Sequence, residues 1–446
     1  MPSDGLFAGV FARGGAAAET DDRAWLQAML DFEAALARAC AHARLVPDEA
    51  AETIAAACRA ELYDAAELGR EASAAGNPVV PLLGALRAQL PEDAAAHLHR
   101  GATSQDVLDT ASMLVARRAL GPLLEDAAAA AAACARLADA HRDSVVVGRT
   151  LLQQAPPLTF ALKASQWLVG MDEARDQLAA VAGGVLAVQL GGAVGTLAAL
   201  EGEGLAVAAE LARELELGEP PLPWHAVRVR PAMLAGALAV LAGALGKVAR
   251  DVTLLAQGEV REAREGGGPG RGGSSTMPHK RNPVAAVSAL ACARRVPGLV
   301  ATIHSAMLQE HERAAGAWQA EWETFSELLR LVGAEAAWAR EMLETLEVDP
   351  ERMRLNLEAA GDLVMAEAVA TALAARLGRG PAHELVEGAA RRAGEEGRSL
   401  RDVLGELPEA AEQLGPEGLD AALVAEAYLG AAPELVERAL AAHERI

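Results

Sequence analysis

Apolar residues recur at intervals of three and four between Pro231 and Glu262, and this pattern constrains the fold more than any other feature of the chain. It comprises Leu234, Leu238, Leu241, Leu245, Val248, Val252 and Leu255. The spacing predicts one α-helix, which at about 1.5 Å per residue is a rod of about 45 Å. Such rods usually pack into bundles, and surplus apolar surface implies contact between subunits. The pattern therefore predicts an oligomeric helical bundle.

Composition supports closely packed helices throughout. Hydrophobic residues make up 52% of the 446 residues but aromatic residues only 3%, so the core is mainly Ala, Leu and Val. Asp21 can cap a first helix, Gly121-Pro122 is expected to end a helix that begins at Ser104, and Asp349-Pro350 begins a last group of helices. We expect an all-α chain with an N-terminal helical domain (1–100), a central long-helix domain (101–347) and a C-terminal helical domain (348–446).

Charge and termini narrow the class of partner. The net charge of −22 argues against nucleic acid and anionic membranes as partners. The uncharged span from Leu178 to Leu200 contains several glycines, which favours a buried helix ending in a turn over a membrane span. The N-terminus lacks the pattern of a signal peptide, and the four cysteines are scattered without a CxxC pair. We expect a cytoplasmic protein without a zinc site or a disulfide framework.

One segment combines backbone freedom with many polar groups. Residues 273–283 read Gly-Ser-Ser-Thr-Met-Pro-His-Lys-Arg-Asn-Pro and follow a glycine-dense run at 266–272. Glycine permits close backbone approach, so the run is typical of a loop over a ligand. Asn282 can cap a helix whose first position is Pro283, and Lys280 adds positive charge near the helix N-terminus. Such a place can hold a carboxylate, although a surface loop followed by an ordinary cap would look the same.

This segment resembles the signature of the fumarase/aspartase superfamily. The resemblance implies a mostly helical homotetramer whose active sites lie where three subunits meet. Its enzymes move a proton α to a carboxylate, usually as a leaving group departs from the next carbon. By the match, Ser274 transfers the proton, and Lys280 and Asn282 bind a substrate carboxylate.

A second motif lies at residues 99–106, His-Arg-Gly-Ala-Thr-Ser-Gln-Asp. Read locally, Thr103 or Ser104 caps a helix and Asp106 completes a capping box. The segment also resembles the equivalent motif of adenylosuccinate lyases and 3-carboxymuconate cycloisomerases, which implies that His99, Thr103 and Ser104 contact the substrate. Arg100 stands where those families commonly have tryptophan.

A third segment distinguishes among branches of the superfamily. In its lyases, a histidine after Gly-Arg-Thr acts with a glutamate beyond the signature, but those two positions are Leu151 and Val287 here. A reaction that expels an amine or water benefits from a positioned acid, whereas a lactonisation needs only one proton-transfer group. With an apolar residue at the histidine position, this part of the chain resembles bacterial 3-carboxy-cis,cis-muconate cycloisomerases. That resemblance extends over most of the chain and implies substrate contacts from Thr150 and Gln153.

The expected activity is therefore conversion of 3-carboxy-cis,cis-muconate to 4-carboxymuconolactone, a step of the protocatechuate branch of aromatic degradation. Arg313 would pair with a further carboxylate, or else is a solvated helix charge. Neither a metal nor an organic cofactor is implied, and the partner is a small polycarboxylate. Three alternatives stay open: a lyase of a substituted succinate such as adenylosuccinate, a catalytically inactive relative, and a serine hydrolase, although no Gly-x-Ser-x-Gly motif occurs. Val229 departs from the branch, which tends to carry an acid there.

Overall fold

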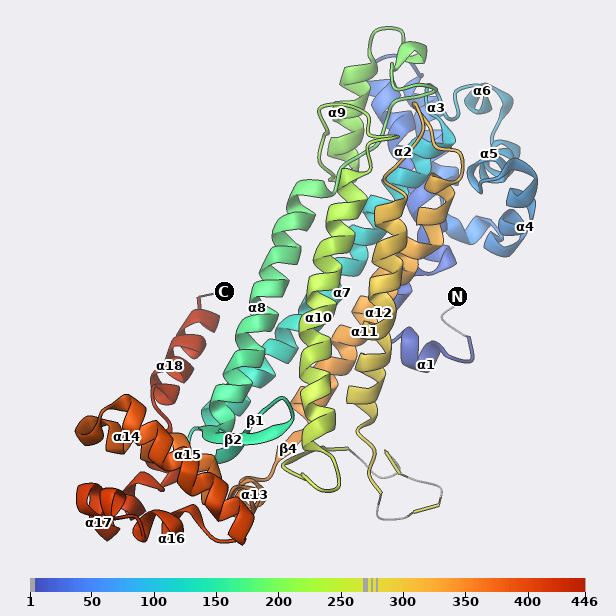
Figure 1. Cartoon of the computed structure of the whole chain (residues 1–446). Helices are drawn as coiled ribbons and strands as arrows, with labels where there is room; N and C mark the ends of the chain where they lie inside the picture. The colour runs from blue at the N-terminus through green and yellow to red at the C-terminus, as the bar shows by residue number, and fades with distance from the viewer. Residues whose placement is uncertain (1–4, 268–271, 274–275, 278–279, 446) are drawn as a thin grey trace. The chain divides into compact units, whose positions relative to one another are not determined.

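The computed structural model describes residues 5–267, 272–273, 276–277 and 280–445 of the chain (Figure 1). It is mostly helical with little sheet, which confirms the expected all-α fold. By contacts the chain forms two compact units. Unit 1 comprises Met1–Ala129, Glu173–Ala249 and Ala285–Glu341, and unit 2 comprises Ala130–Asp172, Arg250–Val284 and Met342–Ile446. The division into three consecutive domains stays a prediction.

Short helices form the N-terminal part of unit 1. The Asp21 carboxylate accepts a hydrogen bond from the Ala24 N–H at 2.8 Å and caps the first long helix, as the sequence predicts. The elements are α1 (Ala8–Phe11), η1 (Gly15–Thr20), α2 (Asp22–His42), α3 (Asp48–Ala57), η2 (Ala60–Leu62), α4 (Ala65–Ala75), α5 (Val79–Ala88) and α6 (Glu92–Ala95).

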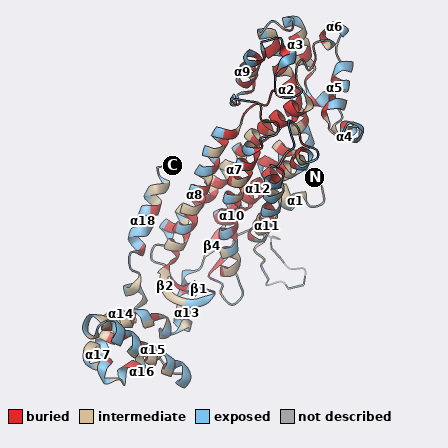
Figure 2. Ribbon diagram, turned by 45° about the horizontal axis from the view of Figure 1, so that its top comes forward, coloured by how far each residue is buried: buried red, intermediate tan, exposed pale blue. Residues whose placement is uncertain are grey.

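Five long helices carry most of the core, and their buried residues line the faces where the helices meet (Figure 2). They are α7 (Ser104–Ala140), α8 (Phe160–Val185), α10 (Val229–Leu255), α11 (Val284–Ser305) and α12 (Ala317–Glu344). The shorter η3 (Ala198–Leu200) and α9 (Gly204–Leu215) lie between α8 and α10 in the sequence. The predicted rod is α10, which begins two residues earlier than expected and ends at Leu255 instead of Glu262.

The predicted end of a helix at Gly121-Pro122 is wrong. Helix α7 continues through Pro122 to Ala140. Proline inside a helix costs about 3 kcal/mol because it removes a hydrogen bond and crowds the preceding turn. The neighbouring Leu120 and Leu123 are buried, so the packing of both flanking turns outweighs this cost. Helix α11 likewise begins at Val284, one residue after the expected Pro283.

Two helices, α10 and α11, are long and apolar enough to cross a membrane when judged by length and composition alone. Most of the apolar window of α10 (61%) is already buried inside the protein, as in the core helix of a soluble bundle. The uncharged Leu178–Leu200 span contains the end of helix α8 at Val185 and then an irregular segment with turns at its glycines, as expected of a helix that ends in a turn.

Unit 2 contains the described strands. Strands β1 (Val145–Thr150) and β2 (Gln153–Thr159) form an antiparallel hairpin whose register is interrupted between Val147 and Gly148. Strands β3 (Ala263–Glu265) and β4 (Leu346–Val348) form a second antiparallel pair. The first pair contains the Gly-Arg-Thr segment at 148–150, and β3 ends one residue before the glycine-dense run that begins at Gly266.

The last helices of unit 2 share one small apolar core, formed by Val369, Leu373, Ala382, Val386, Ala389, Ala393, Leu400, Val403, Leu404, Ala410 and Leu419. As expected, Asp349 caps the first of them by accepting from the Arg352 N–H at 2.9 Å. The elements are α13 (Pro350–Ala360), η4 (Asp362–Met365), α14 (Ala366–Leu377), α15 (Arg379–Glu396), α16 (Leu400–Gly405), α17 (Pro408–Ala422), η5 (Ala425–Tyr428) and α18 (Ala432–His443).

All four cysteines are free thiols inside the core. Burial raises the pKa of Cys40 to about 11 and that of Cys292 to about 12, and it also raises the pKa values of Cys58 and Cys134. Cys134 lies in unit 2 and the other three in unit 1. Because the thiolate is the reactive form, these thiols are inert while the protein is folded.

Candidate active site

Asp106 is the centre of the polar structure around the 99–106 motif. Its side chain is fully buried in the first turn of α7 and accepts from the Thr103 N–H at 3.0 Å, which is one half of the expected capping box. It also accepts from the Gly191 and Gly192 N–H groups at 3.0 and 2.9 Å, and His225 Nε2 lies 2.6 Å away. One carboxylate thus joins three segments of unit 1 that are far apart in the sequence.

Glycine is required where two of these segments touch. A side chain on Gly101 would place its Cβ 2.6 Å from the Leu200 side chain, and one on Gly192 would meet the Gly101 carbonyl oxygen at 2.8 Å. Both residues also have positive φ. The turn before Thr103 and the segment after α8 are therefore packed backbone against backbone.

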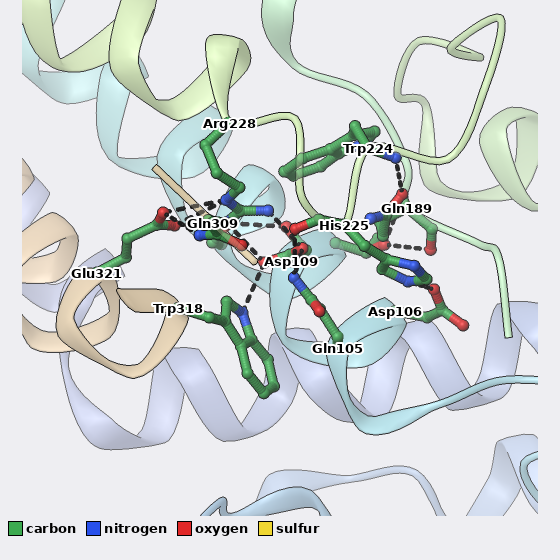
Figure 3. Close-up of polar contacts among 12 residues, drawn as sticks. Gln105, Asp106, Asp109, Gln189, Trp224, His225, Arg228, Gln309, Trp318 and Glu321 are labelled. Atoms are coloured by element: carbon green, nitrogen blue, oxygen red, sulfur yellow. Dashed lines mark hydrogen bonds and ion pairs between the residues drawn. The ribbon is translucent and has the colours of Figure 1, made fainter. Parts of the chain in front are cut away.

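A buried ionic network lies next to this turn (Figure 3). Arg228 donates two hydrogen bonds to Asp109 at 2.7 and 2.9 Å, and its Nε donates to Glu321 at 3.0 Å. Trp318 donates to Asp109 at 3.1 Å, and the Arg228 guanidinium lies over the Trp224 ring at 4.9 Å. Because two carboxylates share one guanidinium, the cluster depends on Arg228 for its charge balance.

The pKa values of the network follow from burial and charge. Burial lowers the pKa of Arg228, but Asp109 and Glu321 more than offset this, so the pKa lies above the ordinary value. Burial also raises the pKa of Glu321, against the opposing effect of Arg228. Both directions are those of a structural ion network inside a low-dielectric core.

Gln105 connects this network to Arg313, one of the predicted substrate contacts. The Gln105 amide donates to the His225 carbonyl at 2.8 Å, and its oxygen accepts from Arg313 Nε at 3.1 Å. Arg313 also reaches the Gly192 carbonyl at 3.4 Å. The structure thus brings half-buried Arg313 to the turn that carries Thr103 and Ser104, while its role in substrate binding stays a prediction.

His99 lies at the other end of this turn. Its Nδ1 is 2.6 Å from Glu33 Oε1, and Glu33 is only 1% exposed on the inner face of α2. The neighbouring Arg100, which replaces the tryptophan common in related families, pairs with Glu201 instead. The side chain of His99 is therefore held by a residue 66 positions away in the sequence.

The signature segment belongs to unit 2, and its described residues include several backbone contacts. Gly273 forms an antiparallel bridge with Arg281, and the Asn282 N–H donates to the Gly272 carbonyl at 2.8 Å. Lys280 is exposed and Asn282 half-buried. The predicted proton-transfer residue Ser274 lies outside the described residues, so its role stays a prediction, as does the position of the 264–280 loop.

The hairpin carries the other predicted contacts of unit 2. Thr150 and Gln153 face each other at its end and are exposed. The turn between them is Leu151-Leu152, and both residues have positive φ. A two-residue turn of this kind suits Asn-Gly and is uncommon for leucine. Next to the turn, Arg149 of β1 forms two hydrogen bonds, at 2.8 and 2.6 Å, with the fully buried Glu262.

The sequence interpretation missed several buried residues that hold these segments: Glu33, Asp109, Arg228, His225 and Glu321 in unit 1, and Glu262 in unit 2. A signal existed for Glu33, because it continues the apolar stripe of α2 and a charge on a buried stripe requires a partner. The partners themselves could not be predicted, since they come from distant segments. The predicted contacts divide between the two units. Unit 1 contains His99, Thr103, Ser104 and Arg313, and unit 2 contains Thr150, Gln153, Lys280 and Asn282.

The fold and these motifs define the class of protein. Residues 15–298 match the family model described as Lyase, and residues 362–439 match the adenylosuccinate lyase C-terminus model. The chain belongs to this lyase family, within the fumarase/aspartase superfamily.

Individual relatives are similar over nearly the whole chain. A 3-carboxy-cis,cis-muconate cycloisomerase of Bradyrhizobium diazoefficiens is 48% identical, covering 96% of both chains. A nitrosuccinate lyase of Streptomyces davaonensis is 44% identical, covering 99% of this chain and 95% of that one. The crystal structure of the 3-carboxy-cis,cis-muconate lactonizing enzyme of Pseudomonas putida superposes with a TM-score of 0.91 at 44% identity, covering 99% of each chain.

Proposed function

We propose that this chain is a cycloisomerase that converts 3-carboxy-cis,cis-muconate to 4-carboxymuconolactone. The observation that carries the proposal is the 48% identity to a cycloisomerase over 96% of both chains. Leu151 and Val287 support it, because neither side chain can give or orient a proton for a departing group. In a lactonisation nothing departs, so no proton donor is needed at either position.

The reaction requires one bond to carbon, one proton and charge stabilisation. A carboxylate oxygen of the substrate adds to its own double bond, and the electron pair moves to the adjacent carbon and its carboxylate. Ser274 delivers a proton to that carbon and regains one from solvent. Lys280 and Asn282 would stabilise the dianionic carboxylate that forms before the proton arrives, and His99, Thr103, Ser104 and Arg313 would hold the others. Each turnover therefore takes up one proton.

We further propose a homotetramer in which neighbouring subunits complete each site. Exposed apolar residues on α10 and α11 support this, since Met233, Val240 and Val287 are each about half exposed in a single chain (49%, 46% and 54%). Burial of these surfaces against other copies also suits a soluble cytoplasmic protein. Sedimentation velocity measures the oligomeric state. Mixing inactive Ser274→Ala and Arg313→Met proteins should restore activity if sites are shared, and should not if each chain is self-sufficient.

The similarity to a nitrosuccinate lyase favours one second candidate, β-elimination of nitrite from nitrosuccinate. Nitrite, like the carboxylate released when the lactone reopens, is a stable anion that needs no proton to depart. An apolar residue at position 151 is thus compatible with both reactions. It is less compatible with adenylosuccinate cleavage, which expels an amine.

Two measurements distinguish these functions. Loss of the diene absorbance of 3-carboxy-cis,cis-muconate, abolished in Ser274→Ala, is the expected result, with nitrosuccinate and adenylosuccinate assayed in parallel. A pH-indicator dye gives a second, independent readout, the direction of the pH change during turnover. Lactonisation takes up a proton, whereas elimination of nitrite releases one. Proton release with nitrosuccinate and no turnover of the muconate would overturn the proposal. Silence with every substrate would indicate an inactive relative.

A further inference from the structure

The contact between Glu33 and His99 leaves part of each side chain unused. Glu33 Oε1 lies 2.6 Å from His99 Nδ1, while its Oε2 is buried without a hydrogen-bond partner among the described residues. His99 Nε2 has no hydrogen bond to the described part of the chain, and 16% of the side chain is exposed. One ring nitrogen is therefore fixed from inside the protein and the other remains available to a ligand.

The backbone of His99 is also unusual. Its φ is +59°, in the left-handed region that few residues other than glycine adopt. Such conformations persist where the surroundings determine them, and they concentrate at functional sites. Here the contact with Glu33 on α2 holds His99 at the start of the turn that leads through Gly101 to Thr103 and Ser104.

The charges around the ring favour its protonated form. Burial lowers the pKa of His99, as does Arg87, but Glu33 and Asp106 raise it more, so the pKa lies above that of a free histidine. Imidazolium is consequently retained to higher pH than in solution. The predicted substrate carries three carboxylates, and Lys280 and Arg313 supply only two of the matching cations.

We propose that Glu33 is a positioning residue for His99: it binds Nδ1–H, keeps the ring cationic and leaves Nε2–H as the donor to the third substrate carboxylate. This inference rests on the proposed polycarboxylate substrate. It assigns Glu33 a role in substrate binding although the residue itself is buried and touches no ligand. The imidazolium adds a charge-assisted hydrogen bond whose strength depends on pH.

A titration of the histidine ring tests the pair without any substrate. The ten histidine side chains are followed by NMR in the intact protein, and His99→Gln identifies the signal of His99. In Glu33→Gln the pKa of His99 should fall, because burial still disfavours the cation and the attracting charge is gone. Glu33→Asp keeps the charge and should stay closer to the wild type. An unchanged His99 titration in Glu33→Gln would overturn the proposal, whatever the enzyme's substrate.

Steady-state kinetics then test the link to binding. At pH 8, Glu33→Gln should raise KM by about tenfold, with a smaller change in kcat, because a ground-state contact is lost. At pH 6 a larger fraction of the ring carries a proton than at pH 8, so the KM of Glu33→Gln should move back towards that of the wild type. Glu33→Gln combined with His99→Gln should be no worse than His99→Gln alone, since the two residues act as one unit.

Glu335→Gln is the matched control, because Glu335 is also a fully buried carboxyl in unit 1 but is distant from His99 in the sequence and in its contacts. It should leave KM unchanged at both pH values. Equal losses at pH 6 and pH 8 in Glu33→Gln would contradict the inference, since disturbed packing alone acts at every pH. If the protein does not turn over the muconate, the substrate assignment is wrong. The titration of the His99 ring still decides whether Glu33 controls His99.

Discussion

The 99–106 segment of unit 1 and the 272–284 segment of unit 2 both supply predicted binding residues, but they are held in different ways. In unit 1, buried side chains do the holding, with Asp106 alone joining Thr103, two glycines and His225. In unit 2, backbone groups contribute to holding the described part of the segment, and Lys280 is exposed. One segment is thus built into a buried framework, whereas the other presents a cationic side chain at the surface. Substitutions in the buried framework of unit 1 should therefore reduce stability, and substitutions in the signature segment of unit 2 should reduce activity.

The largest effect is expected from Ser274→Ala in the signature segment. Loss of the proton-transfer group should reduce kcat by about 10⁴-fold, or about 5.5 kcal/mol of barrier. The melting temperature should change little, because the substitution removes a single hydroxyl group. Single-turnover kinetics and calorimetry measure the two quantities. Residual activity above one-tenth would exclude Ser274 as the proton-transfer residue.

Arg228→Met should show the opposite behaviour in unit 1. It leaves Asp109 and Glu321 buried without their cation, which should lower the free energy of unfolding by roughly 3–5 kcal/mol. Burial raises the pKa of Glu321, so lower pH favours its neutral form, and part of the loss should be recovered between pH 7.5 and pH 5.5. Urea titrations at both pH values measure the loss in the free energy of unfolding. Arg401→Met, which breaks an exposed pair with Asp420, is the control and should cost less than about 1 kcal/mol.

Glu335 sharpens the comparison because it is a buried charge site in unit 1 without a partner. Both of its carboxyl oxygens lack hydrogen bonds within the described residues, and burial raises its pKa well above the ordinary value. A carboxyl with a raised folded-state pKa loses stability as pH rises above its unfolded value, by up to about 1.4 kcal/mol per pH unit. The advantage of Glu335→Gln over the wild type should therefore grow by about 1 kcal/mol or more between pH 5.5 and pH 7.5. A constant difference in denaturant titrations would show that Glu335 does not titrate there.

The smallest effect is expected at the hairpin turn of unit 2. Leu151→Asn with Leu152→Gly supplies residues that accept positive φ, which should stabilise the protein by about 0.5–1 kcal/mol. If position 151 faces the substrate, as the family resemblance implies, activity should fall in the same variant. Thermal unfolding and the muconate assay report the two effects. Lower stability would indicate that the two exposed leucines pack against another copy.

The sequence predicted local features better than distant ones. Caps at Asp21 and Asp349 depend on residues three positions apart, and both were correct. Half of the box at Asp106 was also visible, but its bonds to Gly191, Gly192 and His225 join segments 85 to 119 residues apart, which no local pattern encodes. The error at Pro122 has the same origin, because tertiary packing overrode a local preference.

The family motifs located the candidate site residues where local physics offered only caps and loops. Glu33 shows the limit of both approaches. It lies outside every motif, and only the 2.6 Å contact with His99 reveals its partner. Arg228 was considered only as the neighbour of the unusual Val229, yet the structure makes it the cation of a buried network.

The four enclosed thiols give the protein built-in reporters of local opening. A thiol reagent can modify Cys40, Cys58, Cys134 or Cys292 only when the surrounding helices separate, because each thiol is buried in the folded chain. Three of these reporters belong to unit 1 and Cys134 belongs to unit 2. Labelling followed by peptide mass spectrometry would therefore time the opening of each unit separately, and would show whether the substrate slows one unit more than the other.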